Sequence, residues 1–190
     1  METLTNKTVQ TEKQILESVK NGEHEGQDEM LRRYASRVFA MIVKQVPDVM
    51  DAQELTQDTF LKAFRYIDRY DAQQSSFSTW LCRIAYRLTL DFLKRRRPIV
   101  VSLEDYAFWQ TDISDEELEA GLSTGDNQRI ELLQELVQQL PDEERMLLTL
   151  YYYEDLPLTE IAYITGINSK ALANRLYRIR KKLYKKLMTI

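Results

Sequence analysis

Apolar residues recur at steps of three and four along most of the chain, and no stretch alternates apolar and polar residues as a strand does. This spacing is typical of amphipathic helices, because a helix turns about once every 3.6 residues. Pro47, Pro98 and Pro141 interrupt the pattern, and Asp51 with Glu54 offers a capping box for the helix that follows the first of them. The pattern predicts helices over 10–21, 25–46, 51–66, 76–97, 128–139, 142–154, 158–165 and from 169 onwards.

Residues 98–127 lack a single period and combine acidic groups with Ser, Thr, Gly and isolated aromatic residues. Such a composition is typical of a linker, and we expect at most a short helix near 114–120 within it. The sequence therefore predicts an all-α protein. Two small helical domains, residues 1–97 and 128–190, are joined by an acidic linker at 98–127.

The composition limits the class of protein. Of the 190 residues 44% are hydrophobic, with 5 Gly and 4 Pro, which is typical of a folded chain. One Cys and one His exclude an intramolecular disulfide and argue against a zinc site built from these residues. No apolar run approaches the ~20 residues of a membrane span, and the first residues lack the apolar core of a signal peptide. We expect a cytoplasmic protein without a metal or other cofactor.

The formal net charge of −4 hides a block pattern. The charge is +5 over residues 83–97, −14 over 98–160 and +8 over 161–190. A single charged block is usually a solvated surface. Two basic blocks on separate helices, each with a basic stripe, instead favour nucleic-acid binding.

The second basic block resembles a helix-turn-helix. A helix at 158–165, a turn opening with Gly166, and a helix starting at Ser169 have the required order, and Asn168 can cap the second helix. An ordinary helical hairpin with a basic face is the alternative. In the helix-turn-helix interpretation, the side chains placed to reach base edges or phosphates are Ser169, Lys170, Asn174, Arg175 and Arg178.

The middle basic helix suits single-stranded DNA. Arg83, Arg87, Lys94 and Arg97 fall on one stripe, and Trp80 lies between this stripe and the apolar face. Exposed bases stack on aromatic rings beside such basic grooves. In the alternative interpretation, the aromatic residues are core and the arginines are solvated. That interpretation is favoured for Phe77, and both stay open for Trp80. A polar loop precedes the helix and contains Tyr70, Gln73, Gln74, Ser75 and Ser76.

Three stretches carry a family resemblance: DAQELTQDTFLKAF, FSTWLCRIAYRLTLDFLKRRR and LPDEERMLLTLYYYEDLPLTEIAYITGINSKALANRLYRIRKKL. The chain resembles a bacterial RNA polymerase sigma factor of the extracytoplasmic-function (ECF) group of the sigma-70 family, over about 10–97 and 128–187. The resemblance implies a promoter-specificity subunit with no catalytic residue. Its first domain would bind the clamp of core RNA polymerase and melt and read the −10 promoter element. Its second domain would read the −35 element and contact the polymerase flap. The implied partners are core RNA polymerase, promoter DNA and an anti-sigma factor, with no small-molecule substrate.

The resemblance also assigns residues. Core-polymerase binding falls to Asp51, Glu54, Gln57 and Asp58. Recognition and melting of the −10 element fall to Gln73, Ser75, Ser76, Trp80, Arg83, Arg87 and Lys94. Recognition of the −35 element falls to the five helix-turn-helix residues named above. The chain departs from the family at Arg87, where Asn is usual, at Pro157, where Ser is usual, and at Ala171 and Ala173, which lack groups that could touch DNA.

Two other classes of protein compete with this interpretation. A free-standing helix-turn-helix regulator would bind duplex DNA without polymerase, but it needs no strand-capturing helix. An enzyme such as a nuclease would need a metal or a nucleophile. Asp51, Glu54 and Asp58 share one helical face and are the candidate metal ligands for such an enzyme. Lys62, four residues after Asp58, instead favours a salt-bridged surface there.

Overall fold

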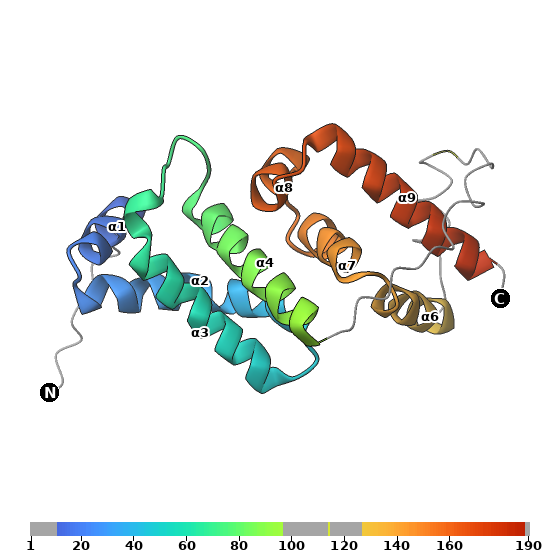
Figure 1. Cartoon of the computed structure of the whole chain (residues 1–190), viewed down its shortest axis with the longest axis horizontal. Helices are drawn as coiled ribbons and strands as arrows, with labels where there is room; N and C mark the ends of the chain where they lie inside the picture. The colour runs from blue at the N-terminus through green and yellow to red at the C-terminus, as the bar shows by residue number, and fades with distance from the viewer. Residues whose placement is uncertain (1–10, 97–113, 115–126, 189–190) are drawn as a thin grey trace, which may run out of the picture.

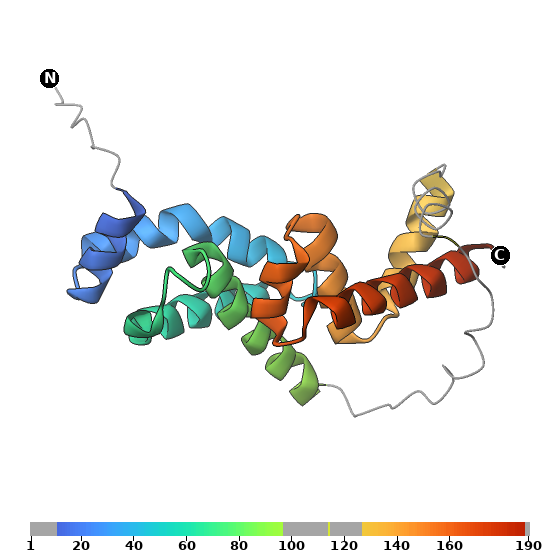
Figure 2. The same ribbon diagram turned by 90° about the horizontal axis from the view of Figure 1, so that it is seen from above.

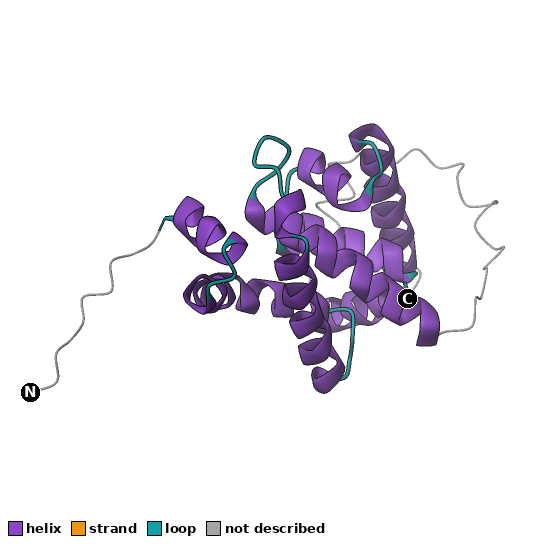
Figure 3. Ribbon diagram, turned by 60° about the vertical axis from the view of Figure 1, so that its left-hand side comes forward, coloured by secondary structure: helices purple, strands orange, loops and turns teal. Residues whose placement is uncertain are grey.

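The structure, a computed structural model, describes residues 11–96, 114 and 127–188. Every element in these residues is helical, as the all-α prediction requires (Figure 3). The predicted short helix near 114–120 and nearly all of the predicted linker lie outside the described residues.

The N-terminal domain consists of α1 (Glu12–Lys20), α2 (His24–Val43), α3 (Val49–Arg65), the short 3-10 turn η1 (Ile67–Arg69) and α4 (Phe77–Arg96). Helix α2 packs against α1, α3 and α4, and α3 packs against α4 (Figure 1). One side of α4 therefore packs against its own domain, and another side faces the C-terminal half of the chain.

The C-terminal domain consists of α6 (Asn127–Gln138), α7 (Asp142–Leu148), the π-helical turn η3 (Thr149–Tyr153), α8 (Leu158–Thr165) and α9 (Ser169–Met188). Helix α9 packs against α6, α7 and α8. The two domains are in contact, because α8 and α7 lie against α4 (Figures 1 and 2).

Two predicted helix boundaries were wrong. Asp48, rather than Asp51, caps α3: its Oδ1 accepts from the backbone N–H of Met50 at 2.8 Å and of Asp51 at 3.2 Å. Asp48 follows Pro47 and has extended backbone, so the helix can begin directly after it. Helix α2 ends at Val43, earlier than expected, and the chain turns before Pro47 with the backbone N–H groups of Gln45 and Val46 both donating to the carbonyl of Ile42.

One cluster of buried apolar side chains extends over both domains. Phe77 is fully buried, which confirms the favoured interpretation of this residue. The apolar residues that recur at steps of three and four along α9 are buried as well: Leu172, Leu176, Ile179, Leu183 and Leu187. Burial of such a stripe fixes which face of the helix remains for solvent or a ligand.

Candidate nucleic-acid and polymerase interface

The turn between α8 and α9 has the predicted geometry. Gly166 adopts a left-handed backbone with φ of 78° and ends α8. The Asn168 Oδ1 accepts from the backbone N–H of Ala171 at 2.9 Å, which confirms the predicted cap of α9. Pro157 precedes α8 and supplies no side-chain cap. Because both ends of the turn are fixed, the first turns of α9 are held in one orientation relative to α8.

The N-terminal half of α9 presents most of the predicted −35 residues to solvent. Lys170, Asn174, Arg175 and Arg178 are exposed, whereas Ser169 is half-buried and its Oγ donates to the carbonyl of Leu158 at 3.4 Å. The four exposed side chains supply cations and an amide, the groups that contact phosphates and base edges.

Further along α9 the basic residues are less available than the sequence suggests. Lys181 is only 4% exposed, with its Nζ 5.9 Å from the Tyr177 ring. Lys182 lies 4.0 Å from Glu144. The exposed cations of α9 are therefore concentrated in its first half and at Lys186.

The predicted strand-contacting residues of α4 form two groups, one exposed and one partly or fully buried. Arg87 and Lys94 are exposed. Arg83 is half-buried, and its guanidinium lies 4.6 Å above the ring of Tyr163 in α8. Trp80 is 7% exposed and belongs to the buried apolar cluster.

The polar loop before α4 is ordered by its own hydrogen bonds. The Asp71 carboxylate accepts from the Gln73 backbone at 2.9 Å and from the Gln74 amide at 3.1 Å. Ser76 Oγ accepts from the backbone N–H of Thr79 at 3.1 Å, as a cap of α4 does. Gln73 and Ser76 are exposed and Ser75 is half-buried, so two of the three predicted residues of this loop are open to a ligand.

The predicted polymerase-binding residues lie on α3. Glu54, Gln57 and Asp58 are exposed. The Asp51 carboxylate instead accepts two hydrogen bonds from the Arg96 guanidinium of α4, at 2.6 and 3.1 Å. No three acidic, His or Cys side chains within the described residues are grouped to hold a metal ion.

Sequence reasoning missed two apolar residues on this helix. Met50 is 73% exposed and Leu61 is 63% exposed. Large apolar side chains so far out of the core are typical of protein-binding surfaces. Their positions close to acidic residues, Met50 just before the predicted helix 51–66 and Leu61 within it, were the available signal.

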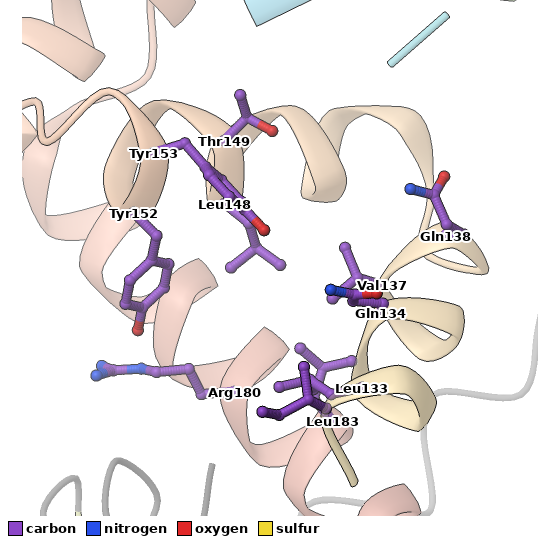
Figure 4. A pocket seen from close by; sticks show the side chains of 11 residues that line it. Leu133, Gln134, Val137, Gln138, Leu148, Thr149, Tyr152, Tyr153, Arg180 and Leu183 are labelled. Carbon is purple, nitrogen blue, oxygen red and sulfur yellow. The ribbon is translucent and has the colours of Figure 1, made fainter. Parts of the chain in front are cut away.

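A groove of about 640 Å³ runs between α6, η3 and α9 in the C-terminal domain (Figure 4). Apolar and aromatic side chains line most of it, and Arg180 lies beside Tyr152 at one end. The other lining residues are Ile130, Leu133, Gln134, Val137, Gln138, Leu148, Thr149, Tyr153 and Leu183. An apolar helix of a partner fits a groove of this kind.

The one cysteine has no nucleophilic character. Cys82 is buried in α4, and burial raises the pKa of its thiol to about 11. Burial likewise raises the pKa of the Tyr86 hydroxyl; nearby Glu143 adds to this rise, whereas Arg175 opposes it. Both groups are therefore neutral at physiological pH.

The two domains are joined by polar contacts that the sequence did not reveal. Gln45 contacts Arg145 and Thr149, Arg37 contacts Glu154, and Thr79 contacts Glu160. We call these contacts, with that of Arg83 on Tyr163, the interdomain seam. The apolar pattern that includes Val38, Met41 and Ile42 continues to Gln45, and this polar residue at an apolar position was the available signal.

Comparison with known proteins identifies the family. Residues 30–99 match the family described as Sigma-70 region 2, and residues 130–183 match Sigma-70, region 4. The chain is 29% identical to the RNA polymerase sigma-H factor of Pseudomonas aeruginosa, over 96% of this chain and 97% of that protein. It is 26% identical to the ECF RNA polymerase sigma factor SigW of Bacillus subtilis, over 92% and 96% of the two chains.

Solved structures share the fold. CnrH, in complex with the cytosolic domain of CnrY, has a TM-score of 0.64 at 20% identity and covers 92% of this chain and 96% of its own. The sigma factor RpoE of Bartonella quintana, in complex with the anti-sigma factor NepR, has a TM-score of 0.58 at 16% identity and covers 86% of this chain and 96% of its own.

None of the described helices is both long and apolar enough to span a bilayer. The region 2 match includes α4, the helix that was expected to contact a melted strand and that a free-standing regulator does not need. The chain therefore belongs to the sigma-70 family, in its ECF group, and is a promoter-specificity factor of transcription initiation.

Proposed function

We propose that three separate helices divide the work of this sigma factor. The exposed face of α3 binds core RNA polymerase, α4 with its preceding loop captures the melted −10 strand, and the start of α9 reads the −35 element. One observation carries this assignment: α3 exposes an acidic and apolar face, and α4 and α9 each expose a basic face. The domains are proposed to be 1–97 and 128–190, with 98–127 between them.

The α3 face has the composition of a protein-binding surface. Glu54, Gln57 and Asp58 provide charged and polar contacts, while Met50 and Leu61 provide apolar area that binding would bury. Charged groups at such a surface steer association, and exposed large apolar side chains are typical of protein-binding surfaces. Asp51 acts differently, as a positioning residue that holds the end of α4 through Arg96.

The start of α9 has the composition of a DNA-reading helix. Asn174 and Arg175 can contact base edges in the major groove, and Lys170 and Arg178 can contact phosphates. Ser169 lies at the turn and can contact the backbone of the duplex. Ala171 and Ala173 offer no polar group, so we expect a −35 preference specific to this chain.

The groove between α6 and α9 is proposed to receive an apolar helix, and the resemblance to ECF sigma factors points to the polymerase flap. A relative of the same fold, RpoE, is bound by an anti-sigma factor, and we propose that this chain has such a partner too. The protein would act in the cytoplasm, where the polymerase and the chromosome are, and would catalyse no reaction itself.

The division of labour is tested with Arg175→Ala combined with Arg178→Ala. Each lost contact to DNA costs ~1–3 kcal/mol, so −35-dependent initiation should fall about tenfold or more. Binding to core polymerase in a pull-down should stay unchanged. The control is Lys13→Ala with Lys20→Ala, which removes the same charge from the exposed surface of α1. Loss of core binding, or an equal loss of initiation in the control, would contradict the assignment.

A further inference from the structure

Helix α1 lies before residue 30, where the region 2 match begins, and it is held firmly in place. At its start, the Thr11 hydroxyl accepts from the Gln14 backbone at 3.3 Å, and the Gln14 side chain accepts from the Thr11 backbone at 2.8 Å. Where α1 crosses α2, a Cβ added to Gly26 would lie 2.6 Å from the Ser18 Cβ, so only glycine allows this close approach. The function proposed above gives this fixed helix no role.

The first residue of α1 makes a polar contact with α2. The hydroxyl of Tyr34, a half-buried residue, donates to the Glu12 carboxylate. Burial, together with this hydrogen bond, raises the pKa of the Tyr34 hydroxyl well above its ordinary value, so the hydroxyl keeps its proton and stays the donor. Hydrogen bonds to a carboxylate are stronger than those between neutral groups. The position of the Tyr34 ring is therefore tied to the start of α1.

The Tyr34 ring begins a row of aromatic contacts that leads to the loop before α4. It lies edge-on to Phe77, with 5.3 Å between centroids and 67° between planes. Phe77 in turn lies edge-on to Tyr70, at 5.2 Å and 87°. Ring pairs in this edge-to-face arrangement attract each other beyond the area that they bury. We call residues 70–76 the −10 loop; Tyr70 is its first residue, and Phe77 follows its last.

Tyr70 carries this packing into the backbone of the −10 loop. Its hydroxyl donates to the carbonyl of Ser75 at 3.2 Å, and so joins the first residue of the loop to its last but one. The loop between them is closed by backbone N–H groups of Gln74 and Ser75, which both donate to the carbonyl of Asp71. A shift of the Tyr70 ring would therefore move Ser75 and change the shape of the loop.

Helix α1 also supports the chain that leads into the −10 loop. It packs against η1, which ends directly before Tyr70. Ile15 and Val19 of α1 and Ile67 of η1 all belong to the buried apolar cluster. The loop is thus held from α1 along two paths, through η1 and through the Tyr34 ring, while Gln73 stays exposed.

We propose that α1, through the hydrogen bond between Glu12 and Tyr34, positions the −10 loop for capture of the melted strand. Both are positioning residues, which act through Phe77 and Tyr70 on the shape of the loop. A loop that adopts several shapes binds a strand less tightly, because only the fitting shape binds, and it discriminates less between base sequences. This inference rests on the function proposed for the loop and α4, and it extends the strand-capturing machinery to a helix outside the region 2 match.

The test uses the full chain assembled with core polymerase. Two fluorescein-labelled single strands are compared: one carries the −10 segment of a promoter mapped by run-off transcription, and the other has the same bases in scrambled order. The ratio of the two affinities measures how well the loop discriminates between sequences. Tyr34→Phe removes the hydroxyl and keeps both ring and charge. We expect it to lower this ratio about fivefold, because a charge-assisted hydrogen bond that holds the ring is lost.

A second variant, Glu12→Ala, separates positioning from net charge. It removes a negative charge, so electrostatics alone would tighten binding of both strands, whereas the proposal predicts weaker binding of the −10 strand and a ratio about fivefold lower. The matched control is Glu17→Ala, which removes the same charge from the exposed surface of α1, where Glu17 lies 3.9 Å from Lys13. The control should change the ratio less than about twofold. An equal decrease in the control would overturn the proposal.

Two further comparisons show whether the two residues act as a pair. Glu12→Gln keeps an acceptor for the Tyr34 hydroxyl and should recover most of the discrimination that Glu12→Ala loses. The double variant Glu12→Ala with Tyr34→Phe should lose no more than either single variant, because both remove the same hydrogen bond. Additive losses, or an unchanged ratio in Tyr34→Phe shown to be folded by circular dichroism, would contradict the proposal. A wild-type chain that binds both strands equally would instead refute the function proposed for the loop itself.

Discussion

Trp80 offers a direct test of how α4 is packed. Its side chain is 7% exposed, and its ring lies 5.6 Å from Tyr70 and 5.7 Å from Phe77, measured between centroids. Trp80→Ala removes this buried ring and leaves a cavity between its neighbours. Such substitutions cost ~3–5 kcal/mol of unfolding free energy. For a chain of this length each kcal/mol lowers the melting temperature by about 2–4 °C, so we expect a decrease of roughly 6–20 °C.

The assay is thermal unfolding followed by circular dichroism, with Tyr152→Ala as the aromatic control. Tyr152 is 49% exposed, so its truncation should cost less than ~1 kcal/mol. Trp80→Phe should recover much of the loss, because it keeps an aromatic ring against Tyr70 and Phe77. A loss below ~1 kcal/mol for Trp80→Ala would refute the packing argument and leave the side chain as an exposed platform for a base.

Three further predictions concern other elements. Glu54→Ala with Asp58→Ala should weaken core binding about tenfold while changing the unfolding free energy by less than ~0.5 kcal/mol, since both side chains are exposed; unchanged affinity in a titration would contradict the role of α3. Gly166→Ala should cost ~1–2 kcal/mol in thermal unfolding because of its φ of 78°, with no steric clash involved; an unaltered melting curve would speak against this. Cys82 should react with iodoacetamide at pH 8 about 100-fold more slowly in the native than in the unfolded protein, because burial raises the pKa of its thiol from 9.0 to about 11; similar rates in both states would disprove its burial.

Local features of the chain could be predicted because their causes lie within a few residues. The turn of the helix-turn-helix depends on the left-handed backbone that Gly166 tolerates and on the side-chain oxygen of Asn168. The cap of α3 was misassigned because Asp48 and Asp51 are both suitable capping residues. Only the path of the chain after Pro47 decides between them, and Asp51 then pairs with Arg96, 45 residues away.

The contacts between the domains could not be predicted, because their partners are far apart in sequence. Gln45 and Arg145 are separated by 100 residues, and Arg37 and Glu154 by 117. Helical periodicity says which face of a helix is apolar, and it does not say which other helix meets a polar residue on that face. The exposure of Trp80 also depended on packing: the sequence placed it at the edge of the apolar face, and in the folded chain the rings of Tyr70 and Phe77 lie against it.

Run-off transcription tests the central claim most directly. The purified protein is added to core RNA polymerase with genomic DNA fragments, and transcript starts are mapped beside a sample that contains Glu54→Ala with Asp58→Ala. The account predicts defined starts that share −35 and −10 elements, and their loss or strong reduction with the α3 variant. Absence of stimulated starts with the wild-type protein would contradict a role as a promoter-specificity factor.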